Sequence, residues 1–529
     1  MKHLATSLLF VAAACAPATT PSSSRPDDSV LGLRAPAPAP AAPSTPSAEA
    51  DEFDLGGVLV PNPKAIGRGK LAVEPRSRSL VTAATKTPTN LGGRADTLAM
   101  LSAGQIKQVG LRRLARAYPV PGVAGMYTIT LNNTGSGWQE TFLLQVPAVP
   151  STTPAPLLVC FHKFGVSQND ILTRTTFFQE AQARNWFCIA PLGAAQVSFS
   201  SLESQVNVRA AIDYVTGAFT IDRARVYGVG FSMGGGSVTS YAARHLDPNG
   251  VMFAAIANHT GGVALPHTYA NEADDDDSDD NIPNFGDHLE VPDILDFWYG
   301  GTPTLNPFAY LRCSMMDLDA TTGTVAPDTD MARNLAHVPI LNWLAAGDPM
   351  VYLYEQTDEF QKHVEHQNTQ NTLVIAPGTV HSWNTLDETA VCNWLAQFTL
   401  QLPTQGRLLA DQDGTWLRFQ VTQDHGGEFT PFDWTATAGT NRLQLSGTRN
   451  LRSLTVDAAG LGLSTTAPLT VQLATLDATG DEIVLTGYAQ APSSVLRDGQ
   501  PASSTFDAQL HTLRLTETDG ATHVWTIAP

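Results

Sequence analysis

The stretch Val226-Tyr-Gly-Val-Gly-Phe-Ser-Met-Gly-Gly-Gly236 joins an apolar strand-like run to a small-residue turn that holds Ser232 between glycines. In a G-x-S-x-G turn, Gly230 and Gly234 stand where a Cβ atom would collide with the neighbouring strand or helix. The bend raises the serine hydroxyl above the sheet edge and aims the first N–H groups of the next helix at one point. The stretch therefore predicts a nucleophilic serine at a strand–turn–helix junction.

The sequence on either side has the order that this turn requires. Ile221 to Arg225 precede the strand, and Ser237 to His245 are expected to continue as a helix. A purely structural glycine-rich turn is the alternative, because such turns are common in a chain with 42 glycines. The succession of strand, turn and helix favours the catalytic interpretation.

Two further strand ends supply the groups that a catalytic serine needs. A hydroxyl is a weak nucleophile until a base takes its proton and a carboxylate orients that base. The apolar run Ile340 to Ala345 leads to Asp348, and the run Thr372 to Ile375 leads through a Pro-Gly loop to His381. The chain order Ser232, Asp348, His381 is that of the α/β-hydrolases, so we predict that these three residues form a catalytic triad.

Each partner of the serine also has a structural interpretation. Asp348 could cap the helix that follows it, with Asp317 and Asp319 as rivals for the acid. His381 is one of 13 histidines, and His259 near another strand end is a rival base. A serine, an acid and a base at suitable strand ends in the right order favour the triad over these separate roles.

The oxyanion hole of such a site is expected to use the backbone N–H of Met233 and one N–H from the loop after the run Leu157 to Phe161. Lys163 stands where many related loops have glycine, which leaves the N–H of Phe164 or of Lys163 as the second donor, and we prefer Phe164. Removing such a donor typically costs about 3 kcal/mol of transition-state stabilisation. The residues that we expect to contact substrate are His162, His259 and Trp383.

Apolar runs of strand length alternate with segments of helix length between residues 120 and 402. This alternation predicts an α/β domain with a mainly parallel sheet covered by helices on both faces, with catalytic groups at the carboxyl ends of strands. A hairpin of Tyr127 to Leu131 and Glu140 to Val146 precedes it. The other runs expected to form strands are Leu157–Phe161, Trp186–Ala190, Val226–Val229, Phe253–Ala257, Ile340–Ala345 and Thr372–Ile375.

An insertion at about 263–312 interrupts the alternation, and its place after a strand end makes it a candidate lid. Its acidic run, residues 271–280, is expected to be a solvated loop, with calcium binding as the alternative. Residues 403–529 change to short alternating strands with turn signals, which predicts an all-β sandwich-like domain. Its aromatic residues are expected to fill the core, with a polymer-binding surface as the alternative: Trp416, Trp434, Tyr488 and Trp525.

The N-terminal region has the features of an exported protein. Residues 1–15 form a basic start, a short apolar run and a small-residue exit that ends at Cys15, typical of an export signal. Cys15 resembles the lipid-bearing cysteine of bacterial lipoproteins, so a membrane attachment through a lipid and simple secretion both remain open. Residues 16–50 are an Ala/Pro/Ser-rich linker without folded structure, and residues 51–119 are an extension of unclear structure, with a candidate helix between Thr97 and Arg116.

The chain has 529 residues and a net charge of −19 at pH 7, which predicts two domains with tails and excludes nucleic acid as a partner. Cys160 and Cys188 fall in strand-like runs and are expected to be buried thiols, whereas Cys313 and Cys392 are either free or joined. No spacing of His and Cys indicates a metal site, and we expect no cofactor. The oligomeric state stays open.

The segments Ile221 to Gly235, Phe253 to Ala257 with Gly261-Gly262, Gly347 to Val351 and His381-Ser-Trp383 resemble the secreted polyhydroxybutyrate depolymerase and feruloyl esterase branch of the α/β-hydrolases. The resemblance covers about residues 120–402. It implies hydrolysis of carboxylic esters, polymeric, feruloyl or acetyl, through an acyl-enzyme. Lys163, the acidic insertion and the β-domain depart from the pattern and leave the acyl and alcohol groups open.

Two other functions are consistent with parts of the sequence. A serine peptidase of the prolyl-oligopeptidase type shares the triad, but it usually carries an N-terminal propeller, and only about a hundred residues precede the core here. A surface binding protein with an inactive hydrolase core would not need Ser, Asp and His together. Both are therefore weaker hypotheses than the esterase.

Overall fold

The computed structural model describes residues 106–107, 124–148, 152–273, 291–326, 329–475, 481–517 and 519–529. The predicted export signal with Cys15, the linker and almost all of residues 51–119 lie outside these ranges, as does the acidic run from Asp274 onward. Ile106 and Lys107 form a short strand where the sequence analysis placed a helix. All the described residues belong to one compact unit.

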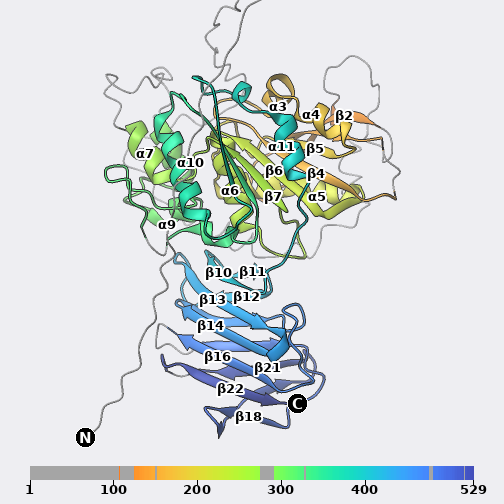
Figure 1. Cartoon of the computed structure of the whole chain (residues 1–529), viewed down its shortest axis with the longest axis vertical. Coiled ribbons are helices and arrows are strands. Elements are labelled where there is room, and N and C mark those ends of the chain that lie inside the picture. The colour runs from red at the N-terminus through yellow and green to blue at the C-terminus, as the bar shows by residue number, and fades with distance from the viewer. Residues whose placement is uncertain are drawn as a thin grey trace, which may run out of the picture. The chain divides into compact units, whose positions relative to one another are not determined.

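A mixed sheet of nine strands is the centre of the first half of the described chain (Figure 1). Its spatial order is β1-β2-β3-β5-β4-β6-β7-β8-β9. The strands are β1 (Ile106–Lys107), β2 (Gly125–Leu131), β3 (Glu140–Val146), β4 (Ala155–Phe161), β5 (Phe187–Pro191), β6 (Ile221–Phe231), β7 (Ala255–His259), β8 (Ile340–Ala345) and β9 (Thr372–Ala376).

The directions of these strands agree with the predicted α/β sheet. The predicted hairpin is present, because β2 and β3 pair antiparallel with Gly125 opposite Val146 and Leu131 opposite Glu140. β3 also runs antiparallel to β5. From β5 through β4, β6, β7 and β8 to β9, every neighbouring pair is parallel, so the carboxyl ends of these strands meet at one edge of the sheet.

Helices cover both faces of the sheet because alternate residues of each strand point to opposite sides. On one face, Val159 of β4 lies in an apolar cluster with Ile212 and Tyr241 from two helices. On the other face, Leu158 of the same strand joins a cluster with Phe178 and Leu395. The two clusters explain why the buried strands have nearly continuous apolar sequences.

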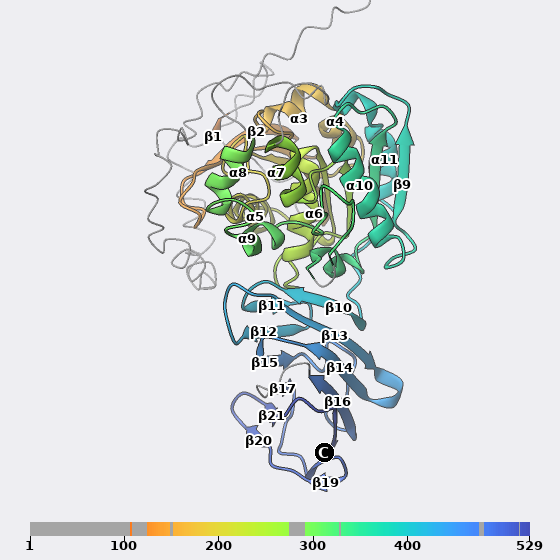
Figure 2. The same cartoon turned by 90° about the vertical axis from the view of Figure 1, so that its left-hand side faces the viewer.

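The helices on the first face are α5 (Leu202–Ala218), α6 (Met233–Arg244) and α10 (Val351–Val364), and those on the second face are α3 (Asn169–Arg174), α4 (Phe177–Ala183) and α11 (Glu388–Leu395). Three more helices follow β7 in the chain: α7 (Leu265–Ala273), α8 (Val291–Tyr299) and α9 (Pro307–Leu311). Figure 2 shows α7 and α8 side by side, in the region that the sequence analysis treated as an insertion. Short 3-10 helices include η2 (Met331–Leu335) and η3 (Trp383–Thr385).

Two β-sheets make up the C-terminal part, as the sequence predicted. One has the order β10 (Gln405–Ala410), β13 (Thr430–Thr437), β14 (Arg442–Thr448), β16 (Leu469–Thr475), β22 (His523–Ala528), β18 (Ser494–Arg497) and β19 (Gln500–Pro501). The other has the order β11 (Gly414–Trp416), β12 (Phe419–Gln423), β15 (Leu451–Val456), β17 (Glu482–Thr486), β21 (Thr512–Thr516) and β20 (Thr505–Asp507). Alternate residues of both sheets share one apolar cluster, as in a sandwich.

The aromatic residues of these sheets fill the core. Trp416, Trp434, Tyr488 and Trp525 are each at most 4% exposed. Phe419 and Trp434 contact each other edge to face, with their ring centroids 5.3 Å apart. The four side chains therefore belong to the core, as the preferred prediction states, and little of their surface is left for contact with a polymer.

A buried ion cluster joins the first β-strand of the C-terminal part to the half that contains the nine-stranded sheet. Asp411 directly follows β10 and pairs with Arg244, the last residue of α6, and with Arg312, the residue after α9. All three side chains are nearly inaccessible to solvent. Asp411 therefore links the C-terminal sheets to the helix that begins directly after Ser232.

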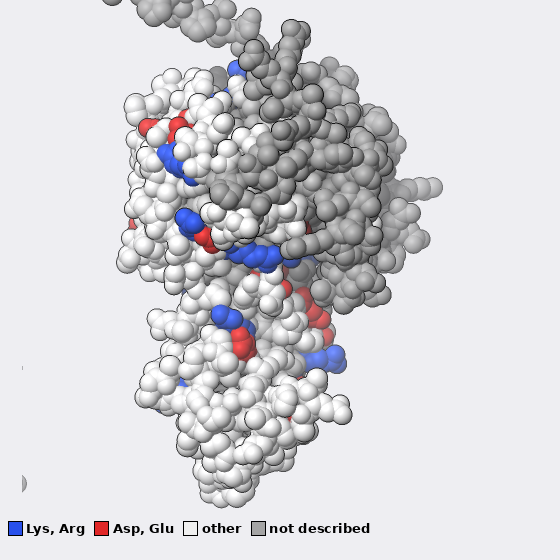
Figure 3. All heavy atoms as spheres, turned by 90° about the vertical axis from the view of Figure 1, so that its right-hand side faces the viewer, with Lys and Arg blue, Asp and Glu red and all other residues white. Residues whose placement is uncertain are grey.

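The described part of the chain has few charged groups on the face that Figure 3 shows and four buried cysteines. Most of the described surface in the view of Figure 3 is formed by uncharged residues, in line with a charged fraction of 15%. Cys160, Cys188, Cys313 and Cys392 are all buried and free, so the disulfide considered for Cys313 and Cys392 is not formed. None of the described helices has the length and apolarity that a membrane span needs.

Candidate active site

Ser232 lies in the tight turn between β6 and α6, with backbone angles φ 57° and ψ −123°. A residue with a side chain rarely adopts a positive φ, and such conformations cluster at functional sites. A Cβ atom at Gly230 would lie 2.0 Å from the carbonyl oxygen of Gly234, and one at Gly234 would lie 2.3 Å from that of Phe161. The two glycines are therefore required by close backbone approaches, as the sequence motif predicts.

Asp348 and His381 meet at the carboxyl ends of β8 and β9. The Nδ1 atom of His381 is 3.0 and 2.9 Å from the two carboxylate oxygens of Asp348. Asp348 also accepts the backbone N–H of Met350 at 2.9 Å, so it helps to begin α10 as well. The carboxylate, which is fully buried, therefore orients the imidazole and caps the adjoining turn at the same time.

The other nitrogen of the His381 ring is available for chemistry. Because Nδ1 faces a carboxylate, that nitrogen holds the proton and Nε2 holds the lone pair. Nε2 is buried and makes no hydrogen bond within the described ranges, so Ser232 Oγ is not bonded to it in this structure. The ring packs on Phe231, the residue before Ser232, with centroids 4.4 Å apart. The imidazole is thus held beside the serine turn with a free acceptor.

The strand order, with antiparallel β3 and then a parallel run, places a serine turn after β6, an acid after β8 and a histidine after β9. That combination decides the fold. The half of the described chain that contains the nine-stranded sheet has the α/β-hydrolase fold. Solved structures that resemble the α/β-hydrolase half include a ferulic acid esterase, which is 16% identical, with a TM-score of 0.36 over 51% of this chain and 96% of that one.

Two further solved structures give similar values. An S-formylglutathione hydrolase from Agrobacterium tumefaciens is 12% identical, with a TM-score of 0.37 over 54% of this chain and 98% of that one. A putative dipeptidyl aminopeptidase IV from Bacteroides ovatus is 15% identical, with a TM-score of 0.37 over 54% of this chain and 36% of that one. No family model and no curated protein matches the chain. The assignment of the α/β-hydrolase fold rests on the strand order and on the place of Ser232.

Two backbone segments meet next to the serine turn, where the sequence analysis predicts an oxyanion hole. Met233 is the first residue of α6, so its N–H lies ahead of the helical hydrogen-bond ladder. The loop after β4 approaches the same helix start, because a Cβ atom at Gly234 would lie 2.6 Å from the carbonyl oxygen of His162. Lys163 and Phe164 follow directly in this loop. The loop that contains the predicted second donor therefore lies next to the start of α6.

The structure does not place His162 where the sequence analysis expected a substrate contact. The His162 side chain is 4% exposed, with Nδ1 2.8 Å from the carbonyl oxygen of Lys163 and Nε2 3.0 Å from that of Leu192. Both ring nitrogens are therefore occupied by the main chain. His162 joins the loops after β4 and β5 instead of contacting substrate.

His259 is also a structural residue, which corrects two expectations for it. Its side chain is fully buried, and its Nε2 lies 3.0 Å from Thr385 Oγ1. Burial lowers the pKa of His259 well below the usual value, and the nearby His381 lowers it further. The carbonyl oxygen of His259 accepts the N–H of Ser232 at 2.9 Å. His259 therefore supports the serine turn through its backbone and is neither the base nor a substrate contact.

Trp383 packs beneath the histidine loop and is not exposed to substrate. Its side chain is 2% exposed, and its Nε1 donates to Asp170 Oδ2 at 2.8 Å. The ring contacts Phe177 and Phe231, with centroids 5.8 and 5.2 Å away. The sequence analysis expected Trp383 to contact substrate, but the structure shows its indole packed under the loop of His381.

An apolar cluster surrounds Met233 on the side of α7 and α8. Its buried members include Phe199, Leu265 and Leu295, and the partly buried Phe164 and others pack against it. The rings of Phe164 and Phe199 lie 5.5 Å apart. The residues that pack around Met233 are therefore mainly aliphatic and aromatic.

Sequence reasoning missed Glu140, a buried carboxylate close to this region. Glu140 is the first residue of β3 and is fully buried. Its carboxylate accepts backbone N–H groups of the turn that follows β5. The available signal was a single acidic residue at the start of an otherwise apolar strand.

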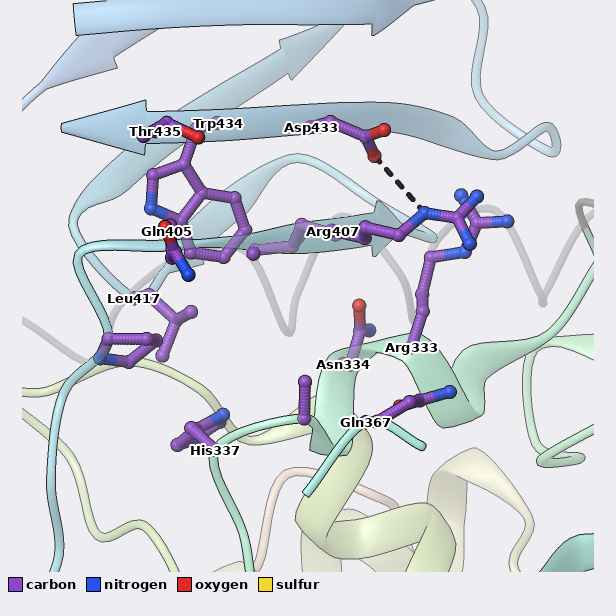
Figure 4. A pocket seen from close by; sticks show the side chains of 14 residues that line it. Arg333, Asn334, His337, Gln367, Gln405, Arg407, Leu417, Asp433, Trp434 and Thr435 are labelled. Atoms are coloured by element: carbon purple, nitrogen blue, oxygen red, sulfur yellow. Dashed lines mark hydrogen bonds and ion pairs between the residues drawn. The ribbon is translucent and has the colours of Figure 1, made fainter. Parts of the chain in front are cut away.

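A cavity of about 550 Å³ lies apart from these groups, between η2 and the strands β10 and β13 (Figure 4). Arg407 and Asp433 line it and form an ion pair at 3.4 Å. None of its lining residues belongs to the site of Ser232. In the described ranges no cluster of three or more His, Cys, Asp or Glu residues could hold a metal ion.

Proposed function

We propose that the protein is a serine hydrolase that cleaves carboxylic esters through an acyl-enzyme intermediate. The observation that carries the proposal is the contact of His381 Nδ1 with Asp348 at 2.9 Å, next to a serine in a strained turn. A serine, an imidazole and a carboxylate in these places have the roles of nucleophile, base and orienting acid. No cofactor or metal takes part in this chemistry.

In the first half of the reaction, Ser232 Oγ attacks the ester carbonyl carbon while His381 Nε2 takes the hydroxyl proton. Asp348 keeps the proton on Nδ1 and stabilises the imidazolium that forms. The negative charge on the carbonyl oxygen is held by the N–H of Met233 and by one N–H of the Lys163–Phe164 segment. The intermediate collapses when His381 gives its proton to the departing alcohol.

In the second half, a water molecule attacks the acyl-enzyme and His381 takes its proton. The same two N–H groups hold the second oxyanion, and Ser232 leaves with the proton returned by His381. The N–H groups are fixed before the substrate binds, because Met233 starts a helix and the second loop packs against that helix. Such preorganisation is what makes each donor worth about 3 kcal/mol.

The surroundings of Met233 favour an apolar acyl group. Phe164, Phe199 and Leu265 belong to or pack against the cluster that contains Met233. Apolar and aromatic linings bind alkyl and aryl groups and exclude water from the oxyanion. We therefore propose hydroxyalkanoate polyesters and feruloyl or acetyl esters as substrates.

A panel of substrates tests this function. Purified protein is assayed on p-nitrophenyl butyrate, methyl ferulate, polyhydroxybutyrate granules and a peptide p-nitroanilide, with Ser232→Ala as the inactive control. Ester hydrolysis that Ser232→Ala abolishes is the expected result. Preferential cleavage of the anilide would indicate a peptidase, and activity that persists in Ser232→Ala would exclude Ser232 as the nucleophile.

We also propose that the protein works outside the bacterial cytoplasm, either secreted or attached to the outer surface through a lipid on Cys15. The basic and apolar start of residues 1–15 supports export. Cells that express the full chain are grown with labelled palmitate and then fractionated. A label lost in Cys15→Ser indicates the lipoprotein, an unlabelled protein in the medium indicates secretion, and retention in the cytoplasm would contradict both.

A further inference from the structure

The carboxylate of Glu140 is bound by three successive backbone N–H groups. Leu192 N–H donates to Oε1 at 2.7 Å, Gly193 N–H to Oε2 at 3.0 Å, and Ala194 N–H to Oε2 at 3.2 Å. Glu140 belongs to β3 and the three donors follow β5, its neighbour in the sheet. A carboxylate has several acceptor lone pairs, so one side chain satisfies the whole turn.

The turn that Glu140 holds has a strained backbone. Gly193 and Ala194 have φ values of 65° and 73°. Two neighbouring residues in this region turn successive N–H groups toward one point, which creates a binding site for an anion. Ala194 has a Cβ atom, so the conformation costs free energy unless an interaction compensates it. The Glu140 carboxylate supplies that interaction from within the protein.

The segment that begins with this turn contacts both halves of the oxyanion hole. Leu192 O is 3.0 Å from His162 Nε2, and Gln196 O accepts the N–H of Gly165 at 3.1 Å, so the segment holds the loop that contains Lys163 and Phe164. Phe199 N–H lies 3.3 Å from the sulfur of Met233. Movement of the segment would therefore shift the loop that contains Lys163 and Phe164 and disturb the packing of the Met233 side chain at the start of α6.

We propose that Glu140 is a positioning residue that holds the oxyanion hole in its catalytic geometry through the segment 192–199. The inference rests on the proposed function, because an oxyanion forms only if Ser232 attacks a carbonyl group. Glu140 itself touches no reacting atom. Its effect is to hold the loop after β4 and the surroundings of Met233 at the start of α6, which carry the two N–H groups.

The ionisation of Glu140 gives the inference a second readout. Burial raises the pKa of Glu140 to about 7, although hydrogen bonds from Ala194, Gly193, Leu192 and Asn207 oppose the rise. When the carboxyl group of Glu140 is protonated, its O–H faces backbone N–H groups, which are also donors. The ionised carboxylate, present above this pKa, therefore binds the turn best. The folded state binds the proton more tightly than the unfolded chain, so folding stability from this group falls as pH rises from about 4.5 to about 7.

The test compares wild type with Glu140→Gln and Glu140→Asp. Glutamine keeps the size but loses the charge and one acceptor, and it is expected to lower kcat/KM for p-nitrophenyl butyrate about 100-fold, as loss of an oxyanion donor does. KM is expected to change little. Phenylboronic acid forms a tetrahedral adduct with a reactive serine. The affinity of Glu140→Gln for this compound should fall in parallel with its kcat/KM. Glu140→Asp keeps the charge, so its loss of kcat/KM should be smaller than that of Glu140→Gln. The aspartate variant also provides the test if the glutamine variant does not fold.

A buried carboxylate elsewhere provides the matched control. Asp481 is fully buried and accepts a hydrogen bond from Thr448 in the C-terminal sheets. Asp481→Asn is expected to change thermal stability but not the affinity for phenylboronic acid. The decline of stability between pH 5 and 7 should be smaller in Glu140→Gln than in wild type and should persist in Asp481→Asn.

The outcomes separate this inference from the proposed function. If wild type hydrolyses esters and Ser232→Ala does not, but folded Glu140→Gln binds phenylboronic acid within twofold of wild type, the positioning role is wrong and the esterase stands. If wild type neither hydrolyses esters nor binds phenylboronic acid, the proposed function itself fails. A parallel loss of kcat/KM and boronate affinity, with KM retained, supports both.

Discussion

Asp348 and His381 are brought together by neighbouring parallel strands, and the carboxylate has both of its oxygens within 3.0 Å of the imidazole Nδ1. The two residues are 33 positions apart in the chain. Their contact fixes which nitrogen faces the serine turn. The geometry thus makes the acid a determinant of the tautomer of His381.

Asp348→Asn is expected to lower kcat about 10⁴-fold, because an amide at this place favours the wrong tautomer of His381. Circular dichroism and the melting temperature should stay close to those of wild type, since asparagine can still accept the N–H of Met350. Initial rates on p-nitrophenyl butyrate measure the effect. Asp319→Asn is the control, because Asp319 is an exposed residue that caps its own turn at Thr321 and Thr322. Full activity in Asp348→Asn would move the acid to another residue.

Gly234→Ala is expected to abolish activity and lower the yield of folded protein. The new Cβ would lie 2.3 Å from a carbonyl oxygen of β4, which the sheet holds in place. Gly217→Ala is the matched control, because it lies in α5 with nothing within 4 Å of the added Cβ. Helix propensity predicts that this control gains up to about 1 kcal/mol. Thermal melts of both variants measure the contrast, and an active, stable Gly234→Ala would contradict the described turn.

Asp411→Asn is expected to reduce the free energy of unfolding by about 3 kcal/mol, because Arg244 and Arg312 would keep buried charges without a carboxylate. Burial raises the pKa of Asp411, but the two guanidinium groups outweigh it and lower the pKa below the usual value. The carboxylate therefore stabilises the fold above its unfolded pKa, and the stabilisation is lost as pH falls below about 4.

Urea unfolding at several pH values measures this effect. The control is Asp433→Asn, whose exposed ion pair with Arg407 should contribute less than about 1 kcal/mol. If Asp411→Asn and Asp433→Asn lower the free energy of unfolding equally, the buried cluster at Asp411 stabilises the fold no more than an exposed ion pair, which would contradict this prediction.

The stability of the C-terminal sheets should depend on pH through His523. Burial lowers the pKa of His523, but hydrogen bonds with Asp519 and Asp498 outweigh it and raise the pKa. The charged ring therefore stabilises the fold below its unfolded pKa of about 6.5, and this contribution disappears as pH rises through the raised folded value. The melting temperature of His523→Gln should fall below that of wild type at pH 5.5 and approach it at pH 9. A constant difference across this range would contradict the assignment.

The chain order of motifs was enough to predict the α/β sheet and to bring Asp348 and His381 together. Apolar strands bounded by a serine turn, a Gly-Asp end and a Pro-Gly loop report directly on a parallel sheet, because each motif belongs to the end of one strand. The expectation that the four aromatic residues of the C-terminal sheets fill the core was also correct. Strand boundaries were less accurate, and β6 begins at Ile221 instead of Val226.

The wrong expectations concern side chains whose role depends on contacts far away in the chain. His162, His259 and Trp383 lie at or beyond strand ends, as catalytic groups do, but their side chains bond to Leu192, Thr385 and Asp170. Their burial depends on loops whose packing has no local sequence pattern. Glu140 was missed for the same reason, because its partners are backbone N–H groups that leave no mark in the sequence.

The most direct test of the central claim is covalent labelling with a fluorophosphonate, followed by intact mass and peptide mapping. We predict one adduct per chain, located on Ser232, with labelling that becomes at least about 10³-fold slower in His381→Ala. An adduct on another residue, or an unchanged labelling rate in His381→Ala, would contradict the claim that His381 activates Ser232.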